Sequence, residues 1–330
     1  MTAEPIRLPA NQPADRFYAG GEHIARFRHS ATPADPFTPE DWIASTTSVR
    51  GHAPTGLTRL PDGRMLSEAI AQDPVAWLGP EHVARFGPDA MLLVKLLDAG
   101  QRLPVHAHPH RDFAARHLGT AHGKAEAWYI LSPGVVYLGL REGIDPARLR
   151  ALVDAQDTSA LLALMNRVEV DAHDTVYVPP GTLHAIGGGV LLAEVQEPED
   201  LSILLEWNGF AIDGATEGHL GLGFDLALAA VTTEPLADGA LSSVICRGAQ
   251  DGPALPPASI GYFRLDRIAS PRVLPAGFAI VIGLTDGLTL STRAGATTID
   301  AGATILVPAA AGDLSFDGQG SALVARPPQA

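Results

Sequence analysis

The sequence has a single cysteine, Cys246, among its 330 residues, which excludes an internal disulfide framework and any multi-cysteine metal site. Basic residues are scarce as well: 23 Lys and Arg stand against 37 Asp and Glu, a formal net charge of −14. This balance disfavours nucleic acid and anionic membrane surfaces as partners, because both need a basic patch. The apolar runs are shorter than the ~18–20 residues that span a bilayer. The N-terminus does not show the basic segment followed by an apolar stretch that is typical of a secretory signal. We therefore expect a cytoplasmic protein that binds neither nucleic acid nor membranes.

The chain has ample material for a folded core, because 46% of its residues are hydrophobic. Its 34 glycines and 27 prolines are spread along the whole length and separate short runs of β-branched, aliphatic and aromatic residues. Many short strands punctuated by turn residues are typical of an all-β sandwich or barrel. The main predicted strands are 125–131, 135–140, 175–178, 190–195, 202–207, 278–284 and 303–307.

A helical pattern interrupts these strands. Asp145 followed by Pro146 combines a good N-cap with the residue preferred at the first helical position, and TSALLALMNRV after Asp157 predicts a second short helix. These helices, at about 145–167, would form an insertion in a β domain covering 1–232. A Gly- and Pro-rich linker then precedes a smaller β domain, 258–330, which contains no histidine and no cysteine.

Histidines are concentrated in one place, since five of the 12 lie within 106–122. In the β-like segment LPVHAHPH, residues two apart project to the same face, so His106 and His108 would point the same way. Glu126 opens the next apolar strand and His184 follows a Pro-Pro-Gly turn; a carboxylate in an apolar strand needs a partner. These four residues are therefore predicted to bind one divalent metal ion. The donor set suits Zn, Fe, Mn, Co or Ni, with Zn favoured for non-redox chemistry.

The arrangement His-x-His, Glu and Pro-x-x-x-His on short strands resembles a cupin and, more narrowly, the type I mannose-6-phosphate isomerases. The matching stretches are VHAHPHRDFA, HGKAEAWYIL and VYVPPGTLHAIGGGVLLAEVQEPED, and Trp42-Ile43-Ala44-Ser45 matches a Trp-x-x-Ser element of that family. The resemblance implies an all-β, cupin-type β-sandwich or jelly roll with a helical insertion. It also implies a second, metal-free cupin-like module that contains FAIVIGLTDG and GATILVPAAAG.

The resemblance further implies roles for individual residues. His108, Glu126 and His184 match three of the family's metal ligands, and His106 takes the place of its glutamine, a conservative change because imidazole is the stronger ligand. Lys124 matches the active-site lysine, and Glu194 matches an acidic residue beyond the last histidine. The remaining candidates for contact with substrate are Ser45, His110 and Glu206.

One family residue is missing. The family has an arginine implicated in catalysis ten residues after the position of Glu194, where this chain has Leu204. Leucine cannot hold a phosphate or a developing oxyanion. Arg26, Arg28 and Arg111 are the candidates to replace that arginine. We therefore expect weaker activity on mannose 6-phosphate, with a non-phosphorylated or differently shaped sugar as the better substrate.

The activity implied by the resemblance is metal-dependent aldose–ketose isomerisation, in which a proton moves between C1 and C2 through an enediol. The partner would be a small-molecule sugar or sugar phosphate and the cofactor Zn or another divalent metal. Lys124 would assist, and Glu194 is the first candidate for the base, ahead of Glu206 and His110. Two other readings stay open: a catalytically silent sugar-binding cupin and an Fe-dependent cupin dioxygenase.

Overall fold

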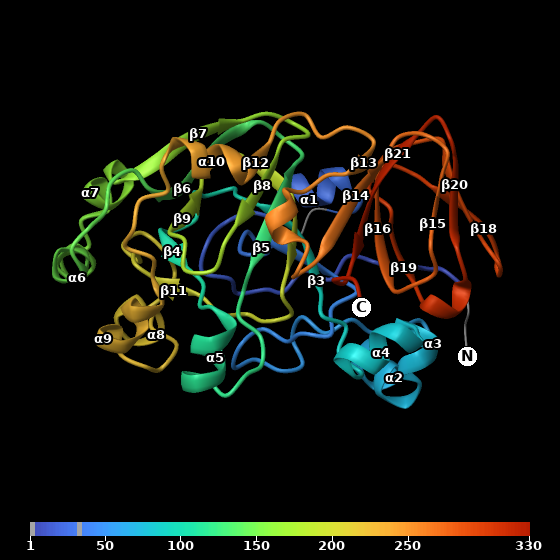
Figure 1. The fold of residues 1–330 in the computed structure, drawn as a ribbon, viewed down its shortest axis with the longest axis horizontal. Helices are drawn as coiled ribbons and strands as arrows, with labels where there is room; N and C mark the ends of the chain where they lie inside the picture. The colour runs from blue at the N-terminus through green and yellow to red at the C-terminus, as the bar shows by residue number, and fades with distance from the viewer. Residues whose placement is uncertain (1–3, 32–34) are drawn as a thin grey trace.

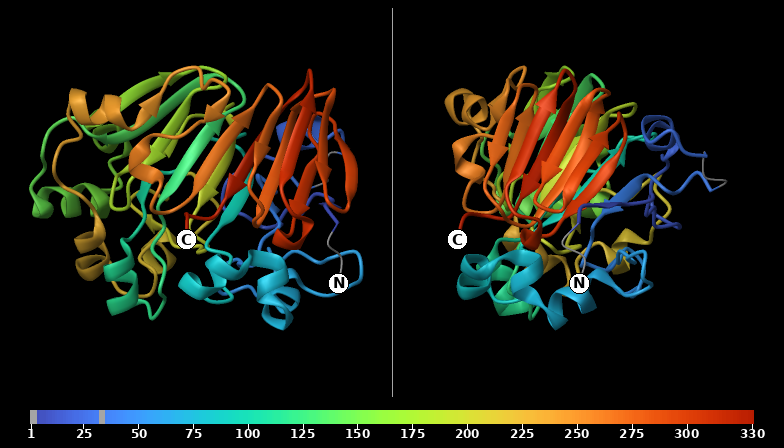
Figure 2. Two further views of the ribbon diagram at one scale, coloured as in Figure 1. Left: turned by 45° about the vertical axis from the view of Figure 1, so that its right-hand side comes forward. Right: turned by 90° about the vertical axis from the view of Figure 1, so that its right-hand side faces the viewer.

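The structure is a computed structural model that describes residues 4–31 and 35–330. Its framework is four antiparallel sheets arranged as two modules, which stand side by side in Figures 1 and 2. The N-terminal module contains most of the blue to yellow strands, and the C-terminal module contains most of the orange and red strands. Mostly antiparallel strands with a few short helices confirm the all-β prediction.

The N-terminal module is built from a six-stranded and a five-stranded sheet. The six-stranded sheet has the order β12 (Ile245–Cys246), β8 (Thr175–Val178), β5 (Glu126–Ile130), β10 (Leu191–Gln196), β3 (Leu93–Asp98) and β2 (Glu40–Ile43). The five-stranded sheet has the order β11 (Ile203–Leu204), β4 (His106–Ala107), β9 (His184–Ile186), β6 (Gly134–Leu140) and β7 (Met165–Val170). Polar side chains gather between these two sheets, and the candidate site lies there.

The helical insertion begins as predicted. Asp145 caps α6 (Pro146–Ala155) by accepting hydrogen bonds from the backbone of the first turn, and Asp157 caps α7 (Thr158–Ala163) in the same way. The second helix is shorter than predicted, because the chain continues from Met165 as β7 and pairs with β6. Strand pairing thus takes over a segment whose local pattern favours a helix. Both helices pack on the outer face of the five-stranded sheet through a hydrophobic cluster that contains Leu149, Val153 and Leu161.

The C-terminal module is a second sandwich of antiparallel sheets. One sheet has the order β1 (Ile6–Arg7), β19 (Thr304–Val307), β16 (Ala279–Thr285), β21 (Ser321–Arg326), β14 (Arg264–Ile268) and β13 (Gly252–Pro253). The other has the order β15 (Arg272–Leu274), β20 (Leu314–Gly318), β17 (Leu288–Thr292) and β18 (Gly295–Ile299). An apolar core fills the space between these two sheets. Strand β1 is the N-terminal contribution to this module, which differs from the predicted assignment of 1–232 to the first domain.

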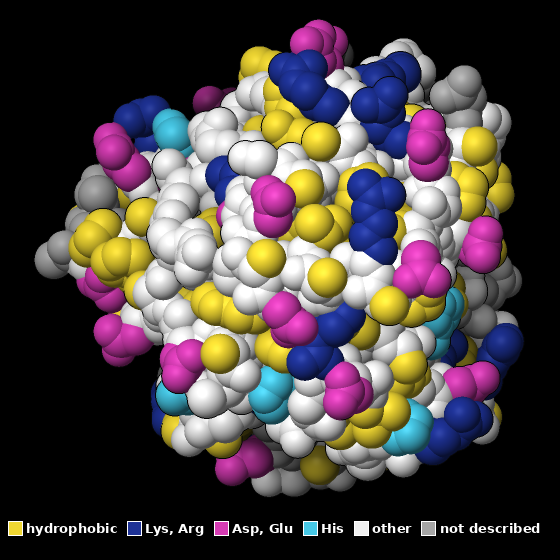
Figure 3. All heavy atoms as spheres, turned by 90° about the vertical axis from the view of Figure 1, so that its left-hand side faces the viewer, with side chains coloured by type: hydrophobic (Ala, Val, Ile, Leu, Met, Phe, Trp, Pro, Cys, Tyr) yellow, Lys and Arg dark blue, Asp and Glu magenta, His cyan; other side chains and the backbone are white. Residues whose placement is uncertain are grey.

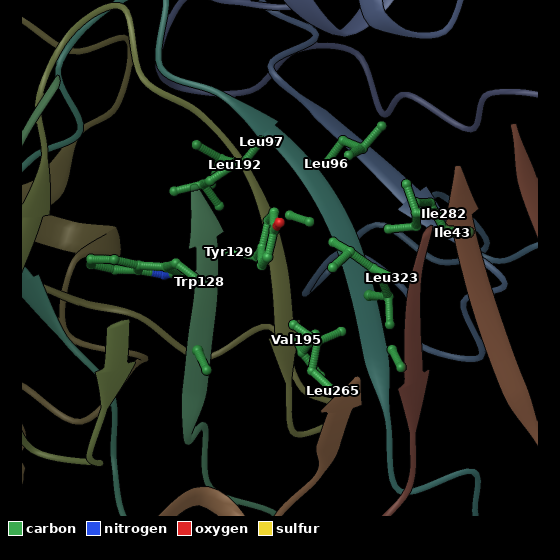
Figure 4. Packing of buried hydrophobic residues seen from close by; sticks show 14 of the residues in the cluster. Ile43, Leu96, Leu97, Trp128, Tyr129, Leu192, Val195, Leu265, Ile282 and Leu323 are labelled. Atoms are coloured by element: carbon green, nitrogen blue, oxygen red, sulfur yellow. The ribbon is translucent and has the colours of Figure 1, made fainter. Parts of the chain in front are cut away.

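The two modules share a hydrophobic interface. Tyr129 and Val195 from the N-terminal module and Ile282, Leu265 and Leu323 from the C-terminal module belong to one buried cluster (Figure 4). Side chains alternate along each strand. Trp128 and Tyr129 therefore point to opposite sides of β5, as Figure 4 shows. The same strands that carry the candidate site on one face contact the second module with the other.

Short helices complete the chain at its periphery. Three of them follow one another below the C-terminal module in Figure 1: α2 (Leu66–Gln72), α3 (Pro74–Leu78) and α4 (Pro80–Phe86). The others are α1 (Glu22–Phe27), α5 (Arg111–His117), α8 (Gly214–Glu217), α9 (Phe224–Ala227) and α10 (Asp238–Ser243). Within the described residues, no helix combines the length and the apolar character needed to cross a bilayer.

Acidic and basic side chains are interspersed on the face of the molecule seen in Figure 3. Several Lys or Arg side chains on this face lie near an Asp or Glu side chain.

Candidate metal and sugar site

Three imidazoles converge between the two sheets of the N-terminal module. His106 in β4 pairs in register with His184 in β9, and His108 follows β4 directly. The ring of His184 lies 4.0 Å from that of His106 and 4.7 Å from that of His108, measured between centroids. One nitrogen of each ring lies within 4.8 Å of the others, and all three side chains are buried. Side chains alternate along a strand, so the residues next to His106 and His184 point the other way. These residues, Val105, Ala107, Leu183 and Ala185, belong to the hydrophobic cluster on the outer face of the sheet.

Hydrogen bonds to the backbone fix the orientation of all three rings. The Nδ1 atoms of His106, His108 and His184 lie 2.8, 2.6 and 2.9 Å from carbonyl oxygens of Pro104, Leu201 and Thr182. A carbonyl can only accept, so each Nδ1 carries the proton and each Nε2 presents its lone pair. Burial lowers the pKa of His106 well below its usual value, and burial together with Lys124 lowers the pKa of His108 to about 3. His106 and His108 are therefore neutral, and all three rings have the orientation that metal-binding histidines adopt.

Glu126 lies directly beside two of the imidazoles. Its carboxylate oxygens are 3.0 Å from Nε2 of His108 and 3.3 Å from Nε2 of His184, and it accepts hydrogen bonds from Lys124 Nζ at 2.7 Å and Trp128 Nε1 at 3.0 Å. Burial opposes its ionisation, but Lys124 together with the other polar groups around the carboxylate outweighs burial and keeps the pKa of Glu126 well below its usual value. Among the described residues, the buried Nε2 of His184 makes no hydrogen bond. Inward-facing lone pairs, a carboxylate and an unsatisfied nitrogen together fit a divalent cation.

A row of cross-strand neighbours extends this site over the six-stranded sheet. Trp42 lies opposite Lys95, Lys95 opposite Glu194, and Glu194 opposite Trp128. Directly opposite residues share a face of the sheet. All four side chains therefore point between the two sheets, toward the imidazoles. Glu194 is diagonal to Glu126, because Glu126 pairs with Gln196, two residues further along β10.

Glu194 and Lys95 belong to a chain of buried charges. Lys95 Nζ is 3.3 Å from Glu40 Oε2 and 3.6 Å from Glu194 Oε1, and its ammonium lies over the ring of Trp42 at 4.5 Å from the centroid. Glu40 also accepts a hydrogen bond of 2.7 Å from Tyr18 and lies 3.3 Å from Arg16. Burial raises the pKa of Glu194, and the nearby negative charge of Glu126 raises it further. The environment thus lowers the pKa of Glu126 and raises the pKa of Glu194.

These residues line one cavity of about 690 Å³. Its walls come from the two sheets, from residues 14–18, from the loop 49–55 and from residues 200–221. Of the predicted site residues, it brings together His106, Lys124, Glu126 and Glu194, and Leu204 in β11 lines it as well. The buried His108 and His184 stand behind this surface, in contact with Glu126.

The other predicted substrate contacts lie elsewhere. Ser45 is buried and bonds within its own loop, donating to the carbonyl of Thr47. Glu206 is buried and bound to Arg102, with its Oε2 accepting from Arg102 Nη1 and from the backbone of Val105 at 2.8 and 2.9 Å. His110 is an exposed residue at the N-cap of α5. Within the described parts of the chain, none of the three lines the cavity, because local hydrogen bonds or the turn of the chain direct their side chains away.

The three candidate arginines also point away from the cavity. Arg26 pairs with Glu22 on the exposed face of α1, and Arg28 lies 3.5 Å from the buried Asp41. Arg111 bonds Glu197 and lies over the ring of Tyr262. The described cations that do line the cavity are Arg16, Arg50, Lys95 and Lys124.

Sequence reasoning missed Arg16, Glu40 and Lys95. Lys95 did offer a signal, because a single charge inside the apolar run LLVKLLD must find a partner in a core. That partner, Glu40, is 55 positions away along the chain, as the numbering in the sequence shows. Only the pairing of β2 with β3 brings the two together.

The chain is similar in sequence to proteins named mannose-6-phosphate isomerases. It is 37% identical over 133 residues to the mannose-6-phosphate isomerase of Streptococcus mutans and 36% identical over 118 residues to ManA of Bacillus subtilis, also named a mannose-6-phosphate isomerase. These matches cover 38% and 34% of this chain, and it spans only 41% and 36% of the relatives' lengths. No protein-family model matches the chain.

The similarity of fold extends much further than that of sequence. The crystal structure of mannose 6-phosphate isomerase from Bacillus subtilis superposes with a TM-score of 0.74 at 20% identity, covering 98% of this chain and 99% of that one. A variant of phosphomannose isomerase from Salmonella typhimurium gives a TM-score of 0.75 at 15% identity, covering 99% and 100%. The cupin fold expected from the histidine motif is thus confirmed. By sequence over part of its length and by fold over nearly all of it, the chain is similar to mannose-6-phosphate isomerases.

Proposed function

We propose that this protein is a metal-dependent aldose–ketose isomerase. The observation that carries the proposal is the convergence of three backbone-oriented imidazoles with Glu126 and Lys124 at the wall of a cavity of about 690 Å³. A cavity of this volume suits a small molecule such as a sugar. Its polar walls suit a substrate rich in hydroxyl groups.

His106, His108, His184 and Glu126 would hold the metal ion. We propose zinc, because three imidazoles and one carboxylate form a donor set that zinc favours and the reaction needs no redox change. When bound, such an ion supplies Lewis acidity toward a carbonyl or hydroxyl oxygen.

The chain's own residues would handle the proton. Glu194 Oε1 is buried, 3.6 Å from Lys95 Nζ and without a hydrogen-bond partner among the described residues, so it can accept a proton from substrate carbon. Lys124 Nζ, hydrogen-bonded to Glu126 Oε2 and His108 Nε2, would donate a hydrogen bond to a substrate oxygen. The apolar Leu97, Leu103 and Ile186 in the lining limit access of water to these groups.

Two measurements on the purified full-length chain test the proposal. Metal analysis should find about one divalent ion per chain, and proton NMR should detect interconversion of at least one aldose–ketose pair from a panel with and without phosphate. Loss of both on chelation and recovery with zinc would support the proposal. Oxygen consumption with bound iron, and no isomerisation, would contradict it and favour a dioxygenase.

The organisation of the chain is part of the same proposal. We assign the chemistry to the N-terminal module with its helical insertion, and a supporting role to a metal-free module at about 258–330. A cytoplasmic location also stays a prediction, drawn from the presence of a single cysteine.

A further inference from the structure

The cavity is lined by more carboxylates than cations. The carboxylates are Asp15, Glu40, Glu126, Glu194, Asp200 and Glu217, and the cations are Arg16, Arg50, Lys95 and Lys124. A divalent ion on the imidazoles would bring the formal charge of this lining to neutrality. The lining therefore holds no excess of positive charge for an anionic ligand.

The buried cations of the lining are already committed to carboxylates. Arg16 lies 3.3 Å from Glu40 and 3.8 Å from Asp200, and Lys95 lies between Glu40 and Glu194. Lys124 donates to Glu126 at 2.7 Å. A phosphate dianion needs charge-assisted donors of its own, and taking one of these cations would leave a buried carboxylate unpaired.

The remaining cation, Arg50, lies at the exposed rim. Its backbone N–H donates to Asp200 Oδ2 at 3.1 Å, and its side chain forms no ion pair with any residue that the structure describes. The exposed carboxylates of Asp15 and Glu217 line the cavity too, so the rim as a whole is not cationic. Leu204, 3% exposed, adds an apolar side chain beside His106.

We infer that the cavity takes a neutral sugar, an unphosphorylated aldose or ketose, and discriminates against the corresponding sugar phosphate. Sugar hydroxyls can donate to the paired carboxylates and accept from the paired cations without breaking any pair. A phosphate would instead bring two negative charges into a lining that cannot compensate them. The reaction is that of the proposed function, on which this inference rests, whereas the choice of ligand rests on the charges alone.

The test compares free and 6-phosphorylated sugars on the metal-loaded full chain. We would measure kcat/KM by NMR for mannose, fructose and their 6-phosphates, and binding of the same four sugars by calorimetry. At least about tenfold higher kcat/KM and tighter binding are expected for the free sugars. Asp200→Asn removes one of the two acceptors facing Arg16 without changing shape, so it should shift the ratio toward the phosphorylated sugars. Asp62→Asn, which alters an exposed carboxylate paired with Arg64, is the matched control and should leave the ratio unchanged.

Each outcome decides between the two claims. A preference for the 6-phosphates that Arg50→Ala abolishes would overturn the inference and leave the isomerase proposal intact. Binding of free sugars without any isomerisation would sustain the inference and contradict the proposed function. Binding of no sugar at all would overturn both.

Discussion

Glu194 lies directly opposite Lys95 in the antiparallel pair of β10 and β3, with its Oε1 3.6 Å from the lysine Nζ. That separation allows electrostatic attraction but is too long for a hydrogen bond. The oxygen is thus buried beside a positive charge and still free to receive a proton. Burial and Glu126 raise the pKa of Glu194, while Lys124 and the other polar groups around Glu126 together keep the pKa of Glu126 low in spite of burial. Two carboxylates with such opposed environments are suited to different tasks, proton transfer and metal binding.

Glu194→Gln tests the role of this proton acceptor. The amide keeps the shape and removes the basic oxygen, so kcat for isomerisation should fall by about 10²–10⁴-fold, with metal content and substrate binding retained. NMR assays of isomerisation measure kcat, and calorimetry on the same preparation measures substrate binding. Glu22→Gln, on an exposed glutamate of α1, is the matched control. Full activity in the Glu194 variant would remove this residue from the mechanism.

His184→Ala tests the metal ligands. This imidazole is fully buried and has an Nε2 without a hydrogen bond in the described structure, so its loss should remove most of the bound metal. Metal analysis after gel filtration gives the result. His110→Ala, at an exposed position outside the cavity, should retain about one ion per chain. Equal metal content in the two variants would contradict the assigned ligand set.

Glu40 is predicted to be important for stability. It neutralises Arg16 and Lys95, and these two cations hold its pKa well below the usual value even though burial opposes that shift. Glu40→Ala would remove the nearer carboxylate of both cations and leave only Asp200 at 3.8 Å from Arg16 and Glu194 at 3.6 Å from Lys95. We expect this to cost about 3–5 kcal/mol in the free energy of unfolding. Urea denaturation measures this cost. Glu169→Ala, at an exposed strand position, should cost less than about 1 kcal/mol.

His122 should make stability depend on pH. Its Nε2 is 2.6 Å from Asp89 and its Nδ1 is 3.9 Å from Glu197; although burial opposes it, these carboxylates raise the pKa of His122 to about 9. The unfolded value is about 6.5, so the folded chain holds this proton more tightly. Its contribution is therefore complete below about pH 6.5 and is lost as the pH rises to about 9.

We expect this contribution to be about 1–2 kcal/mol, since Asp89 is partly exposed and solvent screens the pair. Denaturation of the wild type and of His122→Gln at pH 6 and pH 9.5 measures it. The difference between the two proteins should be larger at pH 6. An equal difference at both values would show that His122 does not titrate as described.

Short-range patterns in the sequence were sufficient for part of this architecture. Asp145 and Asp157 cap helices where they were expected, and the strand 175–178 lies where its residues predicted. The histidine motif was accessible because His106 and His108 are two residues apart, and alternation along a strand is a local property. Their service as metal ligands stays a prediction.

Long-range register could not be read in the same way. The neighbours of Lys95 depend on which strands pair and in what alignment, so Glu40 and Arg16 were not identified. Ser45 and Glu206 lie outside the cavity for another reason. Ser45 bonds within its own loop and Glu206 bonds Arg102 and Val105, and the sequence does not distinguish such structural polar residues from ones that face a ligand. Composition and spacing contain no information on that choice.

A last prediction concerns the contact between the modules. Leu323 of β21 is fully buried in the cluster shared with Tyr129 and Val195. Leu323→Ala should lower the free energy of unfolding by about 2–5 kcal/mol. Because the cluster spans both modules, calorimetry should show one transition for the wild type and for the variant. Two separated transitions in the wild type would mean that the modules unfold independently.

The alternation of Trp128 and Tyr129 along β5 gives one strand two different neighbours. The side of Trp128 faces the candidate site, and the side of Tyr129 packs against the C-terminal module. A substitution in the C-terminal module that tilts β5 or β10 would move Glu126 and Glu194 without touching either. If the proposed isomerase activity depends on these two carboxylates, a screen for inactive variants should therefore also recover substitutions in the C-terminal module.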